Sequence, residues 1–321
     1  MQNSSDFYFS YSSLNKLLYA PVLFYNHYVL GQKEDKLDSY LVDGRILHCR
    51  LLQPKEFDNQ FIVAMDKLPS DNVKIVLDKL CRDFPDISNI EDLELEMLTI
   101  MKDLNYLQSL KTDKQRVEKM LTEDNKKYFT FVKNANGKTI IDSMTLNRMD
   151  ILVEMMRANE EISNLLCLNH SEFDIDLEVL NEIPLQYEVA GYSFAGIKGI
   201  IDNLVINHKT KQVYINDLKT TGKTLVDFKE TIDYYNYWLQ MGIYTLLIKE
   251  MMVKKQIEDY NINCNFVVVD KYNQIYCFPV SINTMQEWLK KTKHMLKVGD
   301  YHIKNNQYSL PYELLKEKYI L

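Results

Sequence analysis

The sequence has no paired cysteines. Its five cysteines are scattered, and no two have the two-residue spacing that zinc and iron–sulfur sites usually use. They are Cys49, Cys81, Cys167, Cys264 and Cys277. We therefore expect a reduced, cytoplasmic setting.

Long apolar runs and an excess of positive charge are also missing. No stretch reaches about 18 uninterrupted apolar residues, and the N-terminus lacks a charged segment followed by an apolar one. We expect neither secretion nor insertion into a membrane. With 38 basic and 45 acidic residues, the net charge is −7, so any contact with nucleic acid must be local or aided by cations.

The first half of the chain has mainly helical patterns. Of the 321 residues, 46% are apolar, which is enough for a sizeable core. Apolar spacing predicts a helix that Pro21 bends and a second helix over 39–53. We assign 1–65 to the N-terminal helical part of the main domain and 66–180 to a helical insert, which has few β-branched alternations.

The pattern changes after residue 180. Segments rich in Ile, Val, Tyr and Phe, separated by short turns, predict three successive antiparallel strands, then a helix, two further strands and a last helix. Their ranges are about 183–189, 194–206, 212–220, 227–250, 265–271, 274–281 and 283–298. This order predicts an α+β, or mixed α/β, domain over 181–321, with one central mixed sheet flanked by helices.

The second and third strands carry acidic residues at one end of a predicted hairpin. With Lys209 and Thr210 at the turn, the numbers of opposed residues add up to about 419, which places Asp202 opposite Asp217. Because side chains alternate along a strand, Lys219 lies on the same face as Asp217. Two carboxylates and one lysine are therefore expected to converge.

This cluster has two interpretations. Neighbouring carboxylates on a half-buried face repel each other, so one becomes protonated or both bind a cation. Magnesium prefers oxygen ligands, and the backbone carbonyl of Leu218 would be a further one. Lys219 would then orient the attacking water or stabilise charge on a phosphate. From the hairpin alone, a structural ion-pair network explains these residues equally well.

The helix after the hairpin carries polar groups on an aromatic face. Tyr237, Gln240 and Tyr244 fall on one side of it. Gln240 is either a surface residue among packing tyrosines or a hydrogen-bonding group for a phosphate or a water molecule at a metal.

Taken together, these segments resemble a known nuclease family, the PD-(D/E)XK nuclease superfamily, in its RecB-like and RecE-like branch of phage-type exonucleases. The motifs that carry the likeness are G-x-x-D at 199–202, D-x-K-T-T at 217–221 and Q-x-x-x-Y at 240–244. The N-terminal part is similar too, with a serine-rich start, a proline-interrupted helix and G-x-x-x-H at 44–48. The likeness covers about 1–65 and 180–300, and it implies the restriction-endonuclease-like core of that superfamily.

The resemblance implies a site for magnesium or manganese. Asp202 and Asp217 are its implied ligands, and His48 matches a histidine that some members use as an additional ligand. By itself, that histidine is more often a helix-surface or core residue. The family also places an acidic residue before the first aspartate. Glu182 and Glu188 compete for this position, and Glu182 fits better because it opens a predicted strand.

The resemblance also implies the residues that act on DNA. Lys219 is the implied catalytic lysine, and Gln240 and Tyr244 shape the site and contact DNA, as do Thr220 and Thr221 of the D-x-K-T-T motif. Members with an iron–sulfur cluster carry one cysteine near the N-terminus and three near the C-terminus. This chain lacks that arrangement, so no cluster is expected.

The leading functional hypothesis is an exonuclease that hydrolyses DNA with magnesium-activated water, in recombination or end processing. A single-strand annealing or recombination protein is then an expected partner. The alternatives are an endonuclease or repair nuclease on the same core, and a DNA-binding or scaffold protein that no longer cuts. With a net charge of −7, the protein must concentrate positive charge in one channel or form a homo-oligomer that does so.

Overall fold

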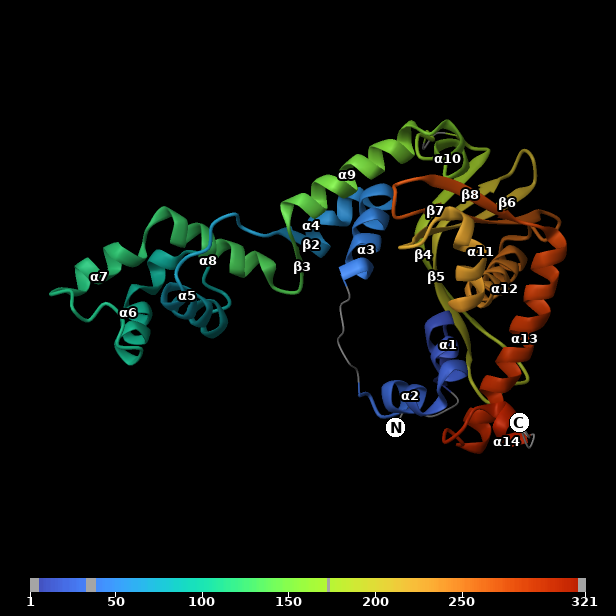
Figure 1. The fold of residues 1–321 in the computed structure, drawn as a ribbon, viewed down its shortest axis with the longest axis horizontal. Helices are drawn as coiled ribbons and strands as arrows, with labels where there is room; N and C mark the ends of the chain where they lie inside the picture. Colours follow the sequence, from blue (N-terminus) through green and yellow to red (C-terminus); the bar gives the residue numbers. More distant parts are fainter. Residues whose placement is uncertain (1–5, 33–38, 172–173, 317–321) are drawn as a thin grey trace. The chain divides into compact units, whose positions relative to one another are not determined.

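The computed structural model describes residues 6–32, 39–171 and 174–316 (Figure 1). Internal contacts divide the chain into two compact units. We call Met1–Pro54 together with Asp150–Leu321 the sheet unit, and Lys55–Met149 the inserted unit. The helical segment expected over 66–180 overlaps the inserted unit, and its last part belongs to the sheet unit.

The sheet unit contains a six-stranded mixed sheet in the order β1-β5-β6-β7-β8, with β4 also paired to β5. Its strands are β1 (Tyr8–Phe9), β4 (Leu177–Glu188), β5 (Gly196–Asn207), β6 (Gln212–Thr220), β7 (Asn261–Val269) and β8 (Ile275–Val280). The pairs β1–β5 and β6–β7 are parallel and the others antiparallel. The predicted mixed α/β fold is confirmed, and the β5–β6 hairpin has the predicted register, with Leu204 opposite Ile215.

Helices pack on the faces of this sheet or against one another, and one of them, over 143–158, begins in the inserted unit. The longer ones are α1 (Tyr11–Tyr19), α3 (Ser39–Leu52), α9 (Ser143–Ala158), α11 (Phe228–Tyr234), α12 (Tyr237–Lys255) and α13 (Ile282–Asn305), and the shorter ones are α2 (Pro21–Phe24), α10 (Glu160–Leu165) and α14 (Tyr312–Lys316). Alternate apolar side chains of β5, β6 and β7 form the main core with α12. Helices α1 and α13 pack beside α12 (Figure 1).

Two helix boundaries have a local cause. The first helix ends at Tyr19 and restarts at Pro21, as the proline predicts. The single helix expected over 227–250 is two helices, because Asn236 between them has the left-handed conformation with φ 56° and ψ 40°. Asparagine adopts this conformation more readily than most residues, and it turns the chain between α11 and α12.

A row of four asparagines crosses the face of the sheet opposite α12. Their side-chain amides hydrogen-bond one another at 2.7–2.9 Å across β4, β5, β6 and β7, through Asn181, Asn203, Asn216 and Asn265. Three further amide protons go to the backbone carbonyls of Leu52, at the end of α3, and of Leu165 and Leu166, at the end of α10. This asparagine ladder satisfies buried polar groups and fixes both helix ends on the sheet.

The inserted unit has its own core of apolar side chains. Its helices are α4 (Phe57–Gln60), α5 (Asp71–Asp83), α6 (Glu94–Asp103), α7 (Asp113–Met120) and α8 (Glu123–Ala135), and its short parallel strands are β2 (Phe61–Val63) and β3 (Thr139–Ile141). Among the helices in the described ranges, none is long and apolar enough to cross a membrane.

Candidate functional site

Three acidic residues meet where β4, β5 and β6 lie side by side. They are Glu182, Asp202 and Asp217, and the two aspartates are 7% and 0% exposed. Asp202 Oδ2 accepts a hydrogen bond of 2.8 Å from the backbone N–H of Leu218, so β6 holds a carboxylate that belongs to β5. Each acid is the sequence neighbour of a ladder asparagine. Because neighbouring side chains on a strand point to opposite faces, the ladder fixes the acids from behind.

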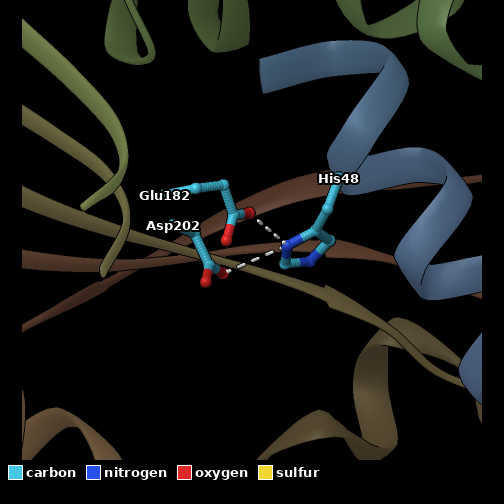
Figure 2. A group of neighbouring side chains, drawn as sticks. All are labelled: His48, Glu182 and Asp202. Atoms are coloured by element: carbon cyan, nitrogen blue, oxygen red, sulfur yellow. Dashed lines mark hydrogen bonds and ion pairs between the residues drawn. The ribbon is translucent and has the colours of Figure 1, made fainter. Parts of the chain in front are cut away.

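A histidine from α3 joins two of these acids. His48 Nδ1 lies 3.1 Å from Glu182 Oε1 and 3.8 Å from Asp202 Oδ2, and His48 Nε2 lies 3.2 Å from the backbone oxygen of Leu218. Figure 2 shows the imidazole and the two carboxylates pointing toward one another. The backbone of Glu182 has a φ of 49°, which is rare for residues other than glycine, asparagine and aspartate. The left-handed backbone therefore occurs at one of the site residues, as it often does in functional sites.

A second group lies on the α12 side of the same strands. Lys219 Nζ is 2.5 Å from Asp217 Oδ2, and the two side chains form an ion pair. Gln240 Nε2 donates to Asp217 Oδ1 at 3.0 Å and to the Tyr244 hydroxyl at 2.8 Å. The ring of Tyr237 lies 4.7 Å from the Lys219 ammonium. The expected convergence of the two aspartates, the lysine and the face of α12 is therefore present.

Burial and neighbouring charges change the acidity of these groups. Burial raises the pKa of Asp217 to about 6, although Lys219 opposes the shift, and burial also raises the pKa of Asp202. Burial alone would lower the pKa of His48, but the carboxylates of Asp202 and Glu182 raise it to about 9. The site thus holds more negative charge than its one lysine balances, and a proton on His48 offsets part of it.

The donor atoms suit a divalent cation. One ligand atom each of His48, Glu182 and Asp202 lies within 4.8 Å of the other two, and the carbonyl of Leu218 adjoins them. One imidazole among carboxylate and carbonyl oxygens matches magnesium or manganese, and the set contains no thiolate. Buried carboxylates with raised pKa values are stabilised when a cation is bound. The residues therefore fit the group that the resemblance implies.

A cavity of about 490 Å³ opens beside the site. Its lining includes Asp202, Gln240, Tyr244, Gly199 and Lys198. A Cβ at position 199 would lie 3.0 Å from the Tyr244 ring, so glycine lets β5 pass close to this ring. The cavity gives a substrate access to Asp202 from the side of β4 and α1.

The remaining predicted residues lie at different distances from this cluster. Thr220 ends β6 beside α3, where a Cβ on Gly44 would be 3.3 Å from Thr220 Oγ1, and the Thr221 N–H bonds to β7. Glu188 pairs with Gly196 at the far end of β4, about 20 Å along the strand from the position of Glu182. The structure thus brings Glu182 to the cluster and leaves Glu188 outside it. Glu182 lies inside β4, so the expectation that it opens a strand is wrong.

The asparagine ladder is the part of the site that the sequence patterns did not reveal. Its signal is nevertheless local, since an asparagine adjoins an acid at 181–182, 202–203 and 216–217. Two of these dipeptides lie on predicted neighbouring strands and the third directly precedes one, and together they indicate a polar row behind an acidic one.

The mixed sheet thus carries three acidic residues and a lysine in one cluster. The chain belongs to the PD-(D/E)XK nuclease superfamily, because the model of that family matches residues 138–307, slightly more than half of its length. No curated protein matches the chain. Among solved structures, it is similar to a candidate exonuclease from Eubacterium rectale, with 12% sequence identity, a TM-score of 0.48 and coverage of 98% of this chain and 89% of that one.

Proposed function

We propose that the protein is a metal-dependent DNA exonuclease that hydrolyses phosphodiester bonds. One observation carries the proposal: the donor atoms of His48, Glu182 and Asp202 gather directly beside the Asp217–Lys219 ion pair. A purely structural ion-pair network gains little from burying Asp202 and Asp217 beside a partly exposed Glu182, since desolvation of buried charges costs more than such pairs return. A site that binds a cation and a phosphate explains the same arrangement.

The metal would be magnesium or manganese. His48, Glu182, Asp202, Asp217 and the carbonyl of Leu218 would hold it. When bound, such a cation polarises a phosphate oxygen and lowers the pKa of water. Binding also replaces the proton on His48, because an imidazole ligates metals only in its neutral form.

The side chains on the α12 side would act on the phosphate and the water. Lys219 would stabilise negative charge that develops on the phosphate, since its ammonium is largely buried beside Asp217. Gln240 Oε1 is buried and has no hydrogen-bond donor among the described residues, so it could accept a hydrogen bond from the attacking water. Burial keeps the pKa of Tyr244 well above its usual value, and its hydroxyl therefore remains a donor for a phosphate oxygen.

The finer assignments rest on the N-terminal part of the chain. The proline-interrupted helix and His48, which reaches the acids from α3, support a RecB-like or RecE-like exonuclease over other members of the superfamily. We propose a role in recombination or end processing, with a recombination protein as partner. An endonuclease with the same residues is the second candidate, because these groups determine the chemistry and not where the strand is cut.

Cleavage of linear and covalently closed circular duplexes with magnesium or manganese tests the proposal. Loss of linear DNA alone indicates an exonuclease, nicked circles indicate an endonuclease, and binding without cleavage removes the enzymatic proposal. Lys219→Ala should lower the rate about 100- to 1,000-fold, as loss of one charge-stabilising group does elsewhere. Lys209→Ala, at the exposed turn of the same hairpin, is the matched control and should cleave like the wild type.

A further inference from the structure

Three tyrosines form a path from the buried lysine to the surface. Tyr237 begins α12 beneath the Lys219 ammonium, and Tyr235 stacks on it with ring centroids 5.5 Å apart and planes 23° apart. Tyr234 meets Tyr235 edge to face at 4.9 Å. Tyr235 and Tyr234 are 45% and 75% exposed. The outer rings of this tyrosine path, Tyr234 and Tyr235, thus add little to the core of the sheet unit.

The backbone beneath these two rings is held in place. Asn236, in the left-handed conformation, accepts a hydrogen bond from Trp238 Nε1 at 3.0 Å and donates one to Asn15 Oδ1 at 2.8 Å. The Tyr11 hydroxyl donates to the Tyr235 carbonyl. These contacts maintain the left-handed backbone conformation of Asn236. The rings of Tyr234 and Tyr235, which precede it, are thereby held at the surface.

Positive charge accompanies the path at both ends. The Lys223 ammonium lies 5.8 Å from the centroid of the Tyr234 ring, and Lys219 lies above Tyr237. Aromatic rings interleaved with cations that follow a phosphate backbone are the general equipment for holding single-stranded nucleic acid, because every base has a face that can stack.

We propose that Tyr234 and Tyr235 stack on unpaired nucleobases of the strand whose phosphate occupies the site beside Lys219. This proposal rests on the proposed nuclease function and specifies its substrate as a single strand or a frayed duplex end. Bases inside a duplex are already stacked on both sides and cannot reach a side chain without leaving the stack. The continuity of the rings from Tyr237 to the surface favours a base of the bound strand over a protein partner as the occupant.

The test measures Kd for a fluorescent single-stranded oligonucleotide with calcium in place of magnesium. The full chain is compared with the Tyr234→Ala/Tyr235→Ala variant, with the corresponding Phe variant, which keeps both rings, and with Tyr19→Ala as control. Tyr19 is 81% exposed on α1 and lies outside the tyrosine path. Stacking of one base on one ring corresponds to about a 5- to 150-fold change in Kd, so the alanine variant should bind at least about 10-fold more weakly. The Phe variant and the control should bind within about twofold of the wild type.

An oligonucleotide with abasic positions separates stacking from other causes. The wild type should bind it more weakly than the normal strand, and the alanine variant should show no further loss. An equal loss on both strands, or tight binding by the alanine variant, overturns the proposal. Tyr234→Ala alone provides the same comparison at the more exposed ring. Cleavage of linear DNA by the wild type is measured in parallel. If the wild type cuts DNA and the alanine variant binds the oligonucleotide with the same Kd, only the stacking proposal is refuted. If the wild type neither binds nor cuts DNA, the proposed function is refuted as well.

Discussion

Replacement of one ladder asparagine tests whether this row stabilises the sheet behind the acids. Asn216 is fully buried, donates to the Leu165 carbonyl and to Asn203 Oδ1, and accepts from Asn265. Asn216→Ala leaves these three groups without their partner at that position. An unsatisfied buried polar group costs about 1–3 kcal/mol, and water can reach a carbonyl at a helix end, so we expect a loss of about 3–5 kcal/mol in the free energy of unfolding.

Urea unfolding followed by tryptophan fluorescence measures this loss selectively. Both tryptophans, Trp238 and Trp288, lie in the sheet unit, so the signal does not follow the inserted unit. With an m-value of about 2–3 kcal/mol per molar urea, the midpoint should fall by about 1–2.5 M. Asn263→Ala on the neighbouring strand β7 removes a half-buried hydrogen bond of 2.8 Å to Gln212 and should cost about 1 kcal/mol or less. If the two variants unfold at the same urea concentration, the ladder does not have the proposed role.

Three further predictions concern the cation. Asp217→Asn should weaken manganese binding at least about 10-fold in titration calorimetry, and an unchanged affinity would remove Asp217 as a ligand. Glu182→Gln should also weaken binding whereas Glu188→Gln should not, and the reverse result would exchange their assignments. The pKa of His48 is raised from 6.5 to about 9, so its charge stabilises the metal-free fold below pH 6.5, and this contribution is lost as the pH rises through about 9. Thermal stabilisation by manganese should therefore grow over this range in melting curves, and His48→Gln should flatten the increase.

Local patterns in the sequence determine much of the sheet. Alternating Ile and Val residues identify β5 and β6, and the short turn between them fixes the register, because a slip of one residue would turn every apolar side chain to the wrong face. The meeting of Asp202 with Asp217 follows from that register. Pairings between distant segments, such as β1 with β5 and β6 with β7, leave no comparable local signal.

The parts of the site that remained open depend on distant packing. Glu182 and Glu188 are an even number of residues apart on β4, so alternation along the strand cannot distinguish them. The position of α3 distinguishes the two candidates, because it brings His48 to Glu182 and not to Glu188. The break at Asn236 is similar, because contacts with Asn15 and Trp238 sustain a conformation that helical spacing alone would not predict.

The inserted unit begins and ends at neighbouring points of the sheet unit. Arg50 near the end of α3 forms an ion pair of 2.7 Å with Asp150 of α9, so the chain leaves and re-enters the sheet unit across one short gap. An insertion whose ends lie close together can be lengthened, shortened or exchanged without disturbing the host fold. Residues 55–149 therefore occupy a position where the length of the chain can change while the strands that carry the acids, and the helix that carries His48, keep their own contacts.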